Sequence, residues 1–132
     1  MAGAPRPEDR PVSPHLSVWR WHVTMASSIL HRFTGIGLYG GGILFAIWLM
    51  AAAAGPETYG QIAPHLTAWY GQVVLYLIVA ALSYHLANGI RHLVFDTGNG
   101  LTPTDADTSA WFAILFAIAA PIGLWALLSF GA

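Results

Sequence analysis

Three long apolar runs, separated by polar segments, dominate the chain. They extend over about residues 33–54, 66–90 and 110–130. Because an α-helix rises about 1.5 Å per residue, roughly 20 apolar residues are enough to cross the hydrocarbon core of a bilayer. A chain of 132 residues is too short to cover three such helices with polar layers. The pattern therefore predicts an all-α membrane protein with three transmembrane helices, forming one membrane-anchor domain over residues 1–132.

The polar flanks set the limits that we expect for each span. Together with these flanks, the spans are assigned to 27–54, 65–95 and 108–131. Residues 1–26 form a cytoplasmic or interfacial arm that is rich in proline at its start. This arm ends in two tryptophans around an arginine, which is typical of an anchor at the membrane surface: Trp19, Arg20 and Trp21.

The two connections between the spans carry no evident chemistry. Residues 55–64 read as an ordinary polar turn on the outer side of the membrane. The inner connection ends with Asp107 and Thr108, either of which has the side chain needed to cap the third span. In the same connection, Asp96 is a candidate ion-pair partner for Arg91.

Composition and charge support the membrane assignment and give it an orientation. The chain is 56% hydrophobic and 8% charged, with a mean hydropathy of +0.59. All five basic residues are arginines; four of them precede the first apolar run and the fifth, Arg91, closes the second. By the positive-inside rule, the N-terminus and the connection after Arg91 face the cytoplasm.

The sequence also narrows the location and the kinds of partner. Glu8 and Asp9 in the first ten residues are unlike a mitochondrial presequence, so we expect a bacterial inner (plasma) membrane rather than a mitochondrial one. The absence of cysteine excludes disulfides, thiolate zinc sites and cysteine-ligated iron–sulfur clusters within this chain. No basic patch points to nucleic acid.

Polar residues recur at helical spacing near the inner end of the second span. His85, Asn88, Gly89 and His92 stand at i, i+3, i+4 and i+7, so they share one helix face. His85 lies seven residues deeper than His92, or about 10 Å. An imidazole at that depth is costly unless it is hydrogen-bonded or ligated. A structural histidine and an axial ligand of a haem iron both satisfy this requirement.

A haem iron with two histidine ligands would need a second one at the depth of His85. At that level we expect about residues 38–40 of the first span and 116–118 of the third, neither of which contains histidine. The second ligand would then come from another chain. Nearer the polar edge we expect a cationic collar suited to haem propionates, formed by His31, Arg32, Arg91 and His92.

The first span carries a second polar stripe. Ser28, Arg32, Gly35 and Tyr39 lie on one face at its inner end. Arg32 either extends to the headgroups or binds an anionic or carbonyl group together with Ser28.

Three short motifs, in this order on a three-span body, carry a family resemblance. They are residues 10–16 (RPVSPHL), 27–35 (SSILHRFTG) and 85–93 (HLANGIRHL), the last followed by Asp96. The chain resembles the cytochrome b membrane-anchor subunits of succinate dehydrogenase (succinate:quinone oxidoreductase, respiratory complex II) over nearly its whole length.

The resemblance implies a set of partners and an electron path. This chain and a second small three-span subunit would share one haem b, and the second subunit would supply the other haem histidine. A flavoprotein subunit would oxidise succinate. Electrons would then pass through an iron–sulfur subunit to ubiquinone near the cytoplasmic face of the membrane.

The resemblance also implies roles for particular residues. His85 becomes the axial ligand of the haem iron, and Ser28 and Arg32 become quinone-binding residues. The propionates would lie near His31, Arg32 and His92. Two alternatives from other classes remain open at this point: a haem-free structural anchor with His85 hydrogen-bonded, and a small transporter or channel subunit with His85 and Arg32 on its path.

Overall fold

A computed structural model describes residues 21–131, which form four helices and no strand. Three helices are long: α1 (Val23–Ala54), α3 (Trp69–Asp96) and α4 (Pro103–Phe130). A short helix, α2 (Pro56–Thr67), joins α1 to α3. Each long helix has the length and apolar composition needed to cross a membrane. The predicted all-α architecture with three spans is therefore confirmed.

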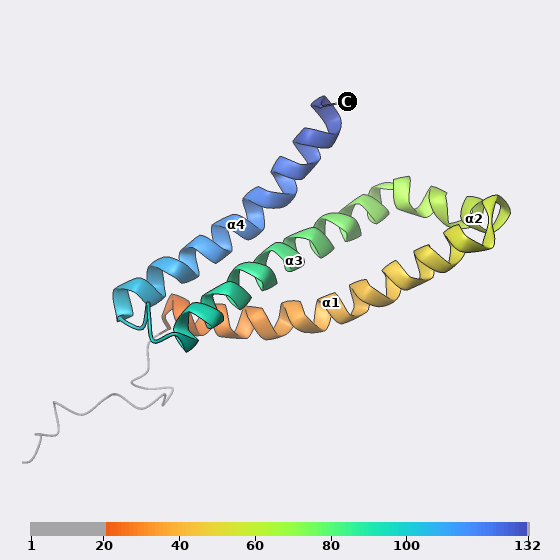
Figure 1. Ribbon diagram of the computed structural model, residues 1–132. Helices are drawn as coiled ribbons and strands as arrows, with labels where there is room; N and C mark the ends of the chain where they lie inside the picture. Colours follow the sequence, from red (N-terminus) through yellow and green to blue (C-terminus); the bar gives the residue numbers. More distant parts are fainter. Residues whose placement is uncertain (1–20, 132) are drawn as a thin grey trace, which may run out of the picture.

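The long helices converge at one end of the molecule and separate toward the other. In Figure 1, α1 and α3 run antiparallel, and α4 packs beside α3 before it diverges toward its C-terminus. At the end where they converge, hereafter the inner end, α3 contacts both other long helices and α1 also contacts α4. The expected anchor at Trp19 and Arg20 and the motif at 10–16 lie outside the described residues.

The helix ends differ from those expected. Helix α1 begins at Val23, four residues before 27, and α4 begins at Pro103, five residues before 108. Thr102 caps α4: its hydroxyl accepts a hydrogen bond from the Asp105 N–H at 3.2 Å. The prediction that Asp107 or Thr108 caps this helix was wrong, because proline at the first helical position and a threonine before it start the helix earlier.

The prediction of an ordinary turn at 55–64 was also wrong, because residues 56–64 belong to α2. Gly55 has φ +106°, a backbone conformation that favours glycine, and Pro56 follows at the start of the helix. Glu57 stands in the first turn, where it complements the helix dipole. Only Ala68 separates α2 from α3. A search for long apolar runs does not detect a short polar helix such as α2.

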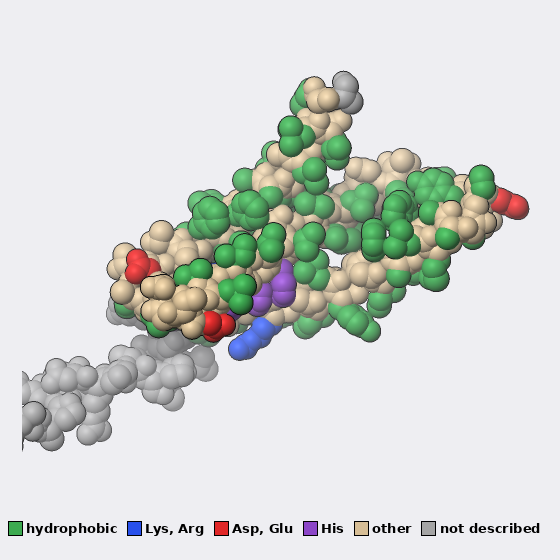
Figure 2. Space-filling view, viewed as in Figure 1, with side chains coloured by type: hydrophobic (Ala, Val, Ile, Leu, Met, Phe, Trp, Pro, Cys, Tyr) green, Lys and Arg blue, Asp and Glu red, His purple; other side chains and the backbone are tan. Residues whose placement is uncertain are grey.

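Little of the apolar surface is buried within this chain. Large hydrophobic side chains along all three long helices are exposed, as the green areas of Figure 2 illustrate. The buried side chains include polar ones near the inner end: Ser27, Asn88 and Arg91, beside Tyr84 and Ala110. Packing within the described chain is therefore tightest near its inner end, and the remaining apolar surface is available to lipid or to other subunits.

Candidate functional site

Three histidines from α1 and α3 form a cluster near the inner end. The rings of His31 and His85 stack with their centroids 3.9 Å apart and an angle of 11° between their planes. His92 is tilted against His31 at 5.4 Å. Figure 2 shows histidine side chains gathered on this face, next to a basic side chain. The structure thus brings together three residues that the sequence analysis named.

The surroundings of His85 leave one ring nitrogen engaged and the other without a hydrogen bond. Its Nδ1 lies 3.3 Å from the hydroxyl of Thr34, which also donates to the carbonyl of His31 at 2.9 Å. Within residues 21–131, Nε2 makes no hydrogen bond. A Cβ atom built on Gly35 would lie 3.3 Å from Cε1 of His85, so this glycine gives the ring its space.

The depth at which α1 meets His85 differs from the expectation. Thr34 and Gly35, not residues 38–40, lie opposite His85. The register of α1 against α3 therefore differs by about one turn from the one that the sequence suggested. The level of His85 therefore does include a histidine of the same chain, His31. Since the two rings stack face to face, no porphyrin fits between them, and His31 cannot be the opposite ligand in this arrangement.

Arg91 takes no part in a collar with the histidines. Its side chain is only 9% exposed and extends to α4, where Nε donates to the Ser109 hydroxyl at 2.8 Å and Nη2 to the Ala106 carbonyl at 3.0 Å. That part of the collar prediction was wrong, and the expected pair with Asp96 is replaced by these bonds. A third, longer contact joins Nη1 to Asn88 Oδ1 at 3.4 Å.

A buried polar network, missed by the sequence analysis, continues from Arg91 to α1. Ser27 donates to Asn88 Oδ1 at 3.0 Å, and the Tyr84 hydroxyl lies 2.9 Å from the Ser27 carbonyl and 3.0 Å from its hydroxyl. Asn88 is 1% exposed. The available signal was the polar character of Tyr84 and Asn88 at i and i+4 of an apolar helix. The network connects all three long helices.

Ser28 and Arg32 lie apart from this network. Arg32 is exposed and forms no hydrogen bond or ion pair with the described part of the chain. Ser28 is half-buried one turn earlier on α1. Both side chains are thus available to a ligand or to another subunit near the inner end.

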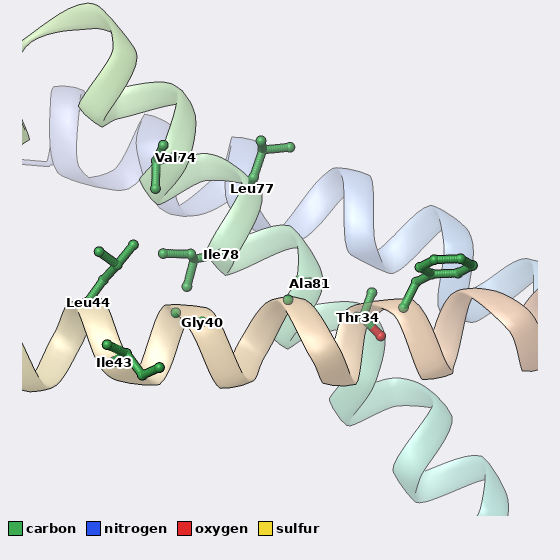
Figure 3. A pocket seen from close by; sticks show the side chains of 11 residues that line it. Thr34, Gly40, Ile43, Leu44, Val74, Leu77, Ile78 and Ala81 are labelled. Carbon is green, nitrogen blue, oxygen red and sulfur yellow. The ribbon is translucent and has the colours of Figure 1, made fainter.

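An apolar groove of about 660 Å³ runs between α1 and α3, outward from Thr34. Figure 3 shows Gly40 and Leu44 of α1 facing Ile78 and Ala81 of α3 across it. Thr34 is the one polar side chain among the residues that line the groove, and it also contacts His85. The glycines of α1 have no side chains to fill the groove, which leaves room for a flat ring or another helix.

A family model described as "Succinate dehydrogenase/Fumarate reductase transmembrane subunit" matches residues 6–124. The chain belongs to this family. It is a cytochrome b subunit of succinate dehydrogenase, and catalysis of succinate oxidation lies in other subunits. Family membership favours this role over the alternative of a small transporter or channel.

Relatives of this subunit occur in bacteria and in mitochondria. A "succinate dehydrogenase cytochrome b556 subunit" of Paracoccus denitrificans is 38% identical over 102 residues, or 77% of this chain and 78% of the relative. The b556 subunit of Rickettsia felis is 34% identical over 116 residues, covering 88% and 90%. The mitochondrial b560 subunit of Sus scrofa is 36% identical over 123 residues, covering 90% and 72%. All three names describe a cytochrome b.

Proposed function

We propose that this subunit binds one haem b through His85 and ubiquinone through Ser28 and Arg32. In this role it anchors the enzyme in the membrane and passes electrons from succinate, via the iron–sulfur subunit, to quinone. The observation that carries the proposal is the ring of His85, which is held at Nδ1 by Thr34 while Nε2 makes no hydrogen bond within the described chain.

The residues around His85 fit a haem. A neutral imidazole with an unengaged nitrogen is a good iron ligand, and the apolar groove next to Thr34 offers a surface for a macrocycle or for the helix that supports it. When bound, a haem supplies one-electron redox chemistry. The stacking of His31 on His85 supports a second ligand from a partner membrane subunit rather than from this chain.

His31, Arg32 and His92 suit the carboxylates of the propionates. His31 and His92 are close to one another, and Nδ1 of His31 is buried without a hydrogen-bond partner among the described residues. This nitrogen is enclosed by the chain itself, so a propionate would approach the cluster from the exposed side chains of Arg32 and His92. There a guanidinium and an imidazole N–H would donate hydrogen bonds to the carboxylates.

Ser28 and Arg32 suit a quinone that approaches from the inner end. They stand one turn apart on α1, and the guanidinium of Arg32 has no protein partner within residues 21–131. A serine hydroxyl donates to a carbonyl oxygen, and a guanidinium stabilises the negative charge that accumulates there on reduction. Water at the membrane surface would supply the protons that quinone reduction consumes.

The proposal includes the location and the companions of the chain. The exposed apolar faces suit a second small membrane-anchor subunit, while the flavoprotein and iron–sulfur subunits would dock on the cytoplasmic face. We place the N-terminus there because the arginines concentrate at that end of the chain. Between the two compartments represented among its relatives, we favour a bacterial inner membrane.

The haem assignment is tested by His85→Leu in the assembled complex, with His65→Leu as the matched control. His65 is exposed in α2 and bonds only to Tyr70 within the described chain. The dithionite-reduced b-type absorption band should disappear from the His85 variant and persist in the control, with all subunits still copurifying. A b-type band of full intensity in an intact His85→Leu complex would show that His85 does not ligate the haem.

The quinone assignment is tested by Arg32→Ala. Ubiquinone reduction by succinate should fall by at least tenfold, because the fixed charge that stabilises the reduced quinone is lost. Succinate oxidation with an artificial acceptor at the soluble subunits should remain close to that of the unmodified complex. Equal loss of both activities would point to damaged assembly and would contradict the role.

A further inference from the structure

Thr34 lies between the groove and His85, and no role was assigned to it from the sequence. Its hydroxyl oxygen is 2.9 Å from the carbonyl of His31 on its own helix and 3.3 Å from Nδ1 of His85 on the facing helix. These two contacts involve one hydroxyl, which has a single proton and two lone pairs. The shorter contact determines where that proton lies.

The proton balance specifies the tautomer of His85. Since a carbonyl oxygen only accepts, the Thr34 hydroxyl donates to His31 and has lone pairs left for His85. The bond at 3.3 Å then requires a proton on Nδ1 of His85. A neutral imidazole carries one N–H, so its Nε2 is left with a free lone pair. That is the form in which a histidine ligates a metal through Nε2.

We propose that Thr34 is a positioning residue for the axial ligand of the haem. It selects the tautomer of His85 that has a free Nε2 and, by accepting a hydrogen bond from Nδ1–H, makes the imidazole a stronger electron donor. Hydrogen bonds of this kind orient a ligating histidine and raise its basicity. Gly35 acts beside it by leaving space for the ring, because a Cβ there would lie 3.3 Å from Cε1. The inference rests on the proposed function.

The test uses the assembled complex with Thr34→Val, which keeps the shape of the side chain and removes the hydroxyl. Thr34→Ser retains the hydroxyl and should restore the original behaviour. Thr108→Val is the matched control, because Thr108 makes the same kind of bond to a carbonyl of its own helix, at 2.8 Å from Thr104, on an exposed part of α4. The readouts are haem content, the midpoint potential of the haem and its low-spin EPR signal.

In Thr34→Val the imidazole becomes a weaker donor, so the ferrous form gains stability. We expect a several-fold rise in the ratio of reduced to oxidised haem at a fixed ambient potential. A tenfold rise would equal an upward shift of about 59 mV for a one-electron couple. The EPR signal should shift in the same variant, while Thr34→Ser and Thr108→Val keep the original potential and signal.

The possible results separate this inference from the proposed function. If Thr34→Val keeps its haem with an unchanged potential and EPR signal, the inference fails and the haem assignment stands. If Thr34→Val loses haem and Thr34→Ser retains it, the positioning role is supported. Loss of haem in both variants, or an equal shift in Thr108→Val, overturns the inference. If the unmodified complex contains no haem, the proposed function fails as well.

Discussion

Close contact at His85 depends on one residue without a side chain. Gly35 faces the ring at a distance where an added Cβ would stand 3.3 Å from Cε1, tighter than ordinary van der Waals contact. Six residues along the same helix, Gly41 faces Ile78, where an added Cβ would be 3.4 Å or more from the nearest atoms. Both glycines face α3, but Gly35 faces the ring of His85 and Gly41 faces the aliphatic side chain of Ile78.

This difference predicts that the same substitution, glycine to alanine, changes the haem content at one site and not at the other. Gly35→Ala should displace His85 from its bond with Thr34 and lower the haem content of the purified complex at least twofold. Gly41→Ala should leave the haem content unchanged, because its methyl group meets only the side chain of Ile78 and fills space in the groove. Alanine also raises helix propensity by roughly 1 kcal/mol at either site, so propensity cannot explain a difference between them.

Haem content is measured from the pyridine haemochrome spectrum per mole of complex. Equal content in both variants would show that the ring of His85 moves aside freely. Loss of haem in both would indicate that any added side chain on this face of α1 disturbs its packing on α3. The specific role of Gly35 beside His85 would then be contradicted.

Individual residues were predictable from sequence only where helical spacing places them on one face. His85 and His92 were grouped in this way, and His31 was assigned to the same end of the molecule. Thr34 was not found, because its role depends on the register between two helices that are far apart in sequence. The same limit explains Arg91, whose hydrogen-bond partners on α4 follow 15 and 18 residues later.

Arg91 connects elements as a structural residue. It is a buried cation with bonds to α4 and a contact with Asn88, which in turn bonds to α1 through Ser27. Removing such a donor leaves the Ala106 carbonyl and the Ser109 hydroxyl without this partner in a desolvated place. The network therefore holds α4 against the other spans at their inner end.

Arg91→Leu should accordingly destabilise the complex more than Arg32→Leu does. Hydrogen bonds to a charged group contribute about 1.5–3 kcal/mol in soluble proteins, and those between membrane helices about 1–2 kcal/mol or less. We expect a loss of about 1–3 kcal/mol for Arg91→Leu, seen as a lower Tm of the detergent-solubilised complex without added quinone. Arg32 is exposed and makes no bond within the described chain, so its variant loses only ligand contacts and should lower the Tm less than Arg91→Leu does.

Arg91→Lys refines the test. An ammonium group keeps the charge and lacks the planar fork that reaches the acceptors on α4, so an intermediate Tm is expected. If the Arg32 variant proves the less stable of the two leucine variants, the division into a structural and a ligand-binding arginine is wrong.

At the level of elements, the apolar runs were sufficient to predict the three spans and not their ends. Hydropathy identifies the part of a helix that lies in lipid, whereas α1 and α4 begin in polar sequence that hydropathy ignores. Helix α2 was not predicted for the same reason, although Gly55 followed by proline and an acidic residue is a helix-start signal. Local start signals would have corrected both α2 and α4.

At the scale of the whole molecule, the described chain leaves much apolar surface uncovered. Its long helices separate away from the inner end, and most of their large side chains are exposed (Figures 1 and 2). Lipid or another subunit can cover such surfaces, and the haem that we propose at His85 would need a second membrane subunit to enclose it. The proposed partners and the orientation in the membrane therefore determine how this fold functions, and orientation is the part that this chain allows to be measured most directly.

The absence of cysteine makes the proposed topology directly testable, because a single introduced cysteine is then the only thiol in the chain. Thr58 in α2 and Asn99 in the connection between α3 and α4 are exposed positions at opposite ends of α3. With the N-terminus cytoplasmic, a membrane-impermeant maleimide should label Thr58→Cys in intact spheroplasts and Asn99→Cys in inverted vesicles stripped of the soluble subunits. Labelling of both after detergent treatment is the control for reactivity. Reaction of Asn99→Cys in intact spheroplasts, with Thr58→Cys protected, would invert the topology and place Ser28 and Arg32 at the face opposite the iron–sulfur subunit, where they could not serve the proposed quinone site.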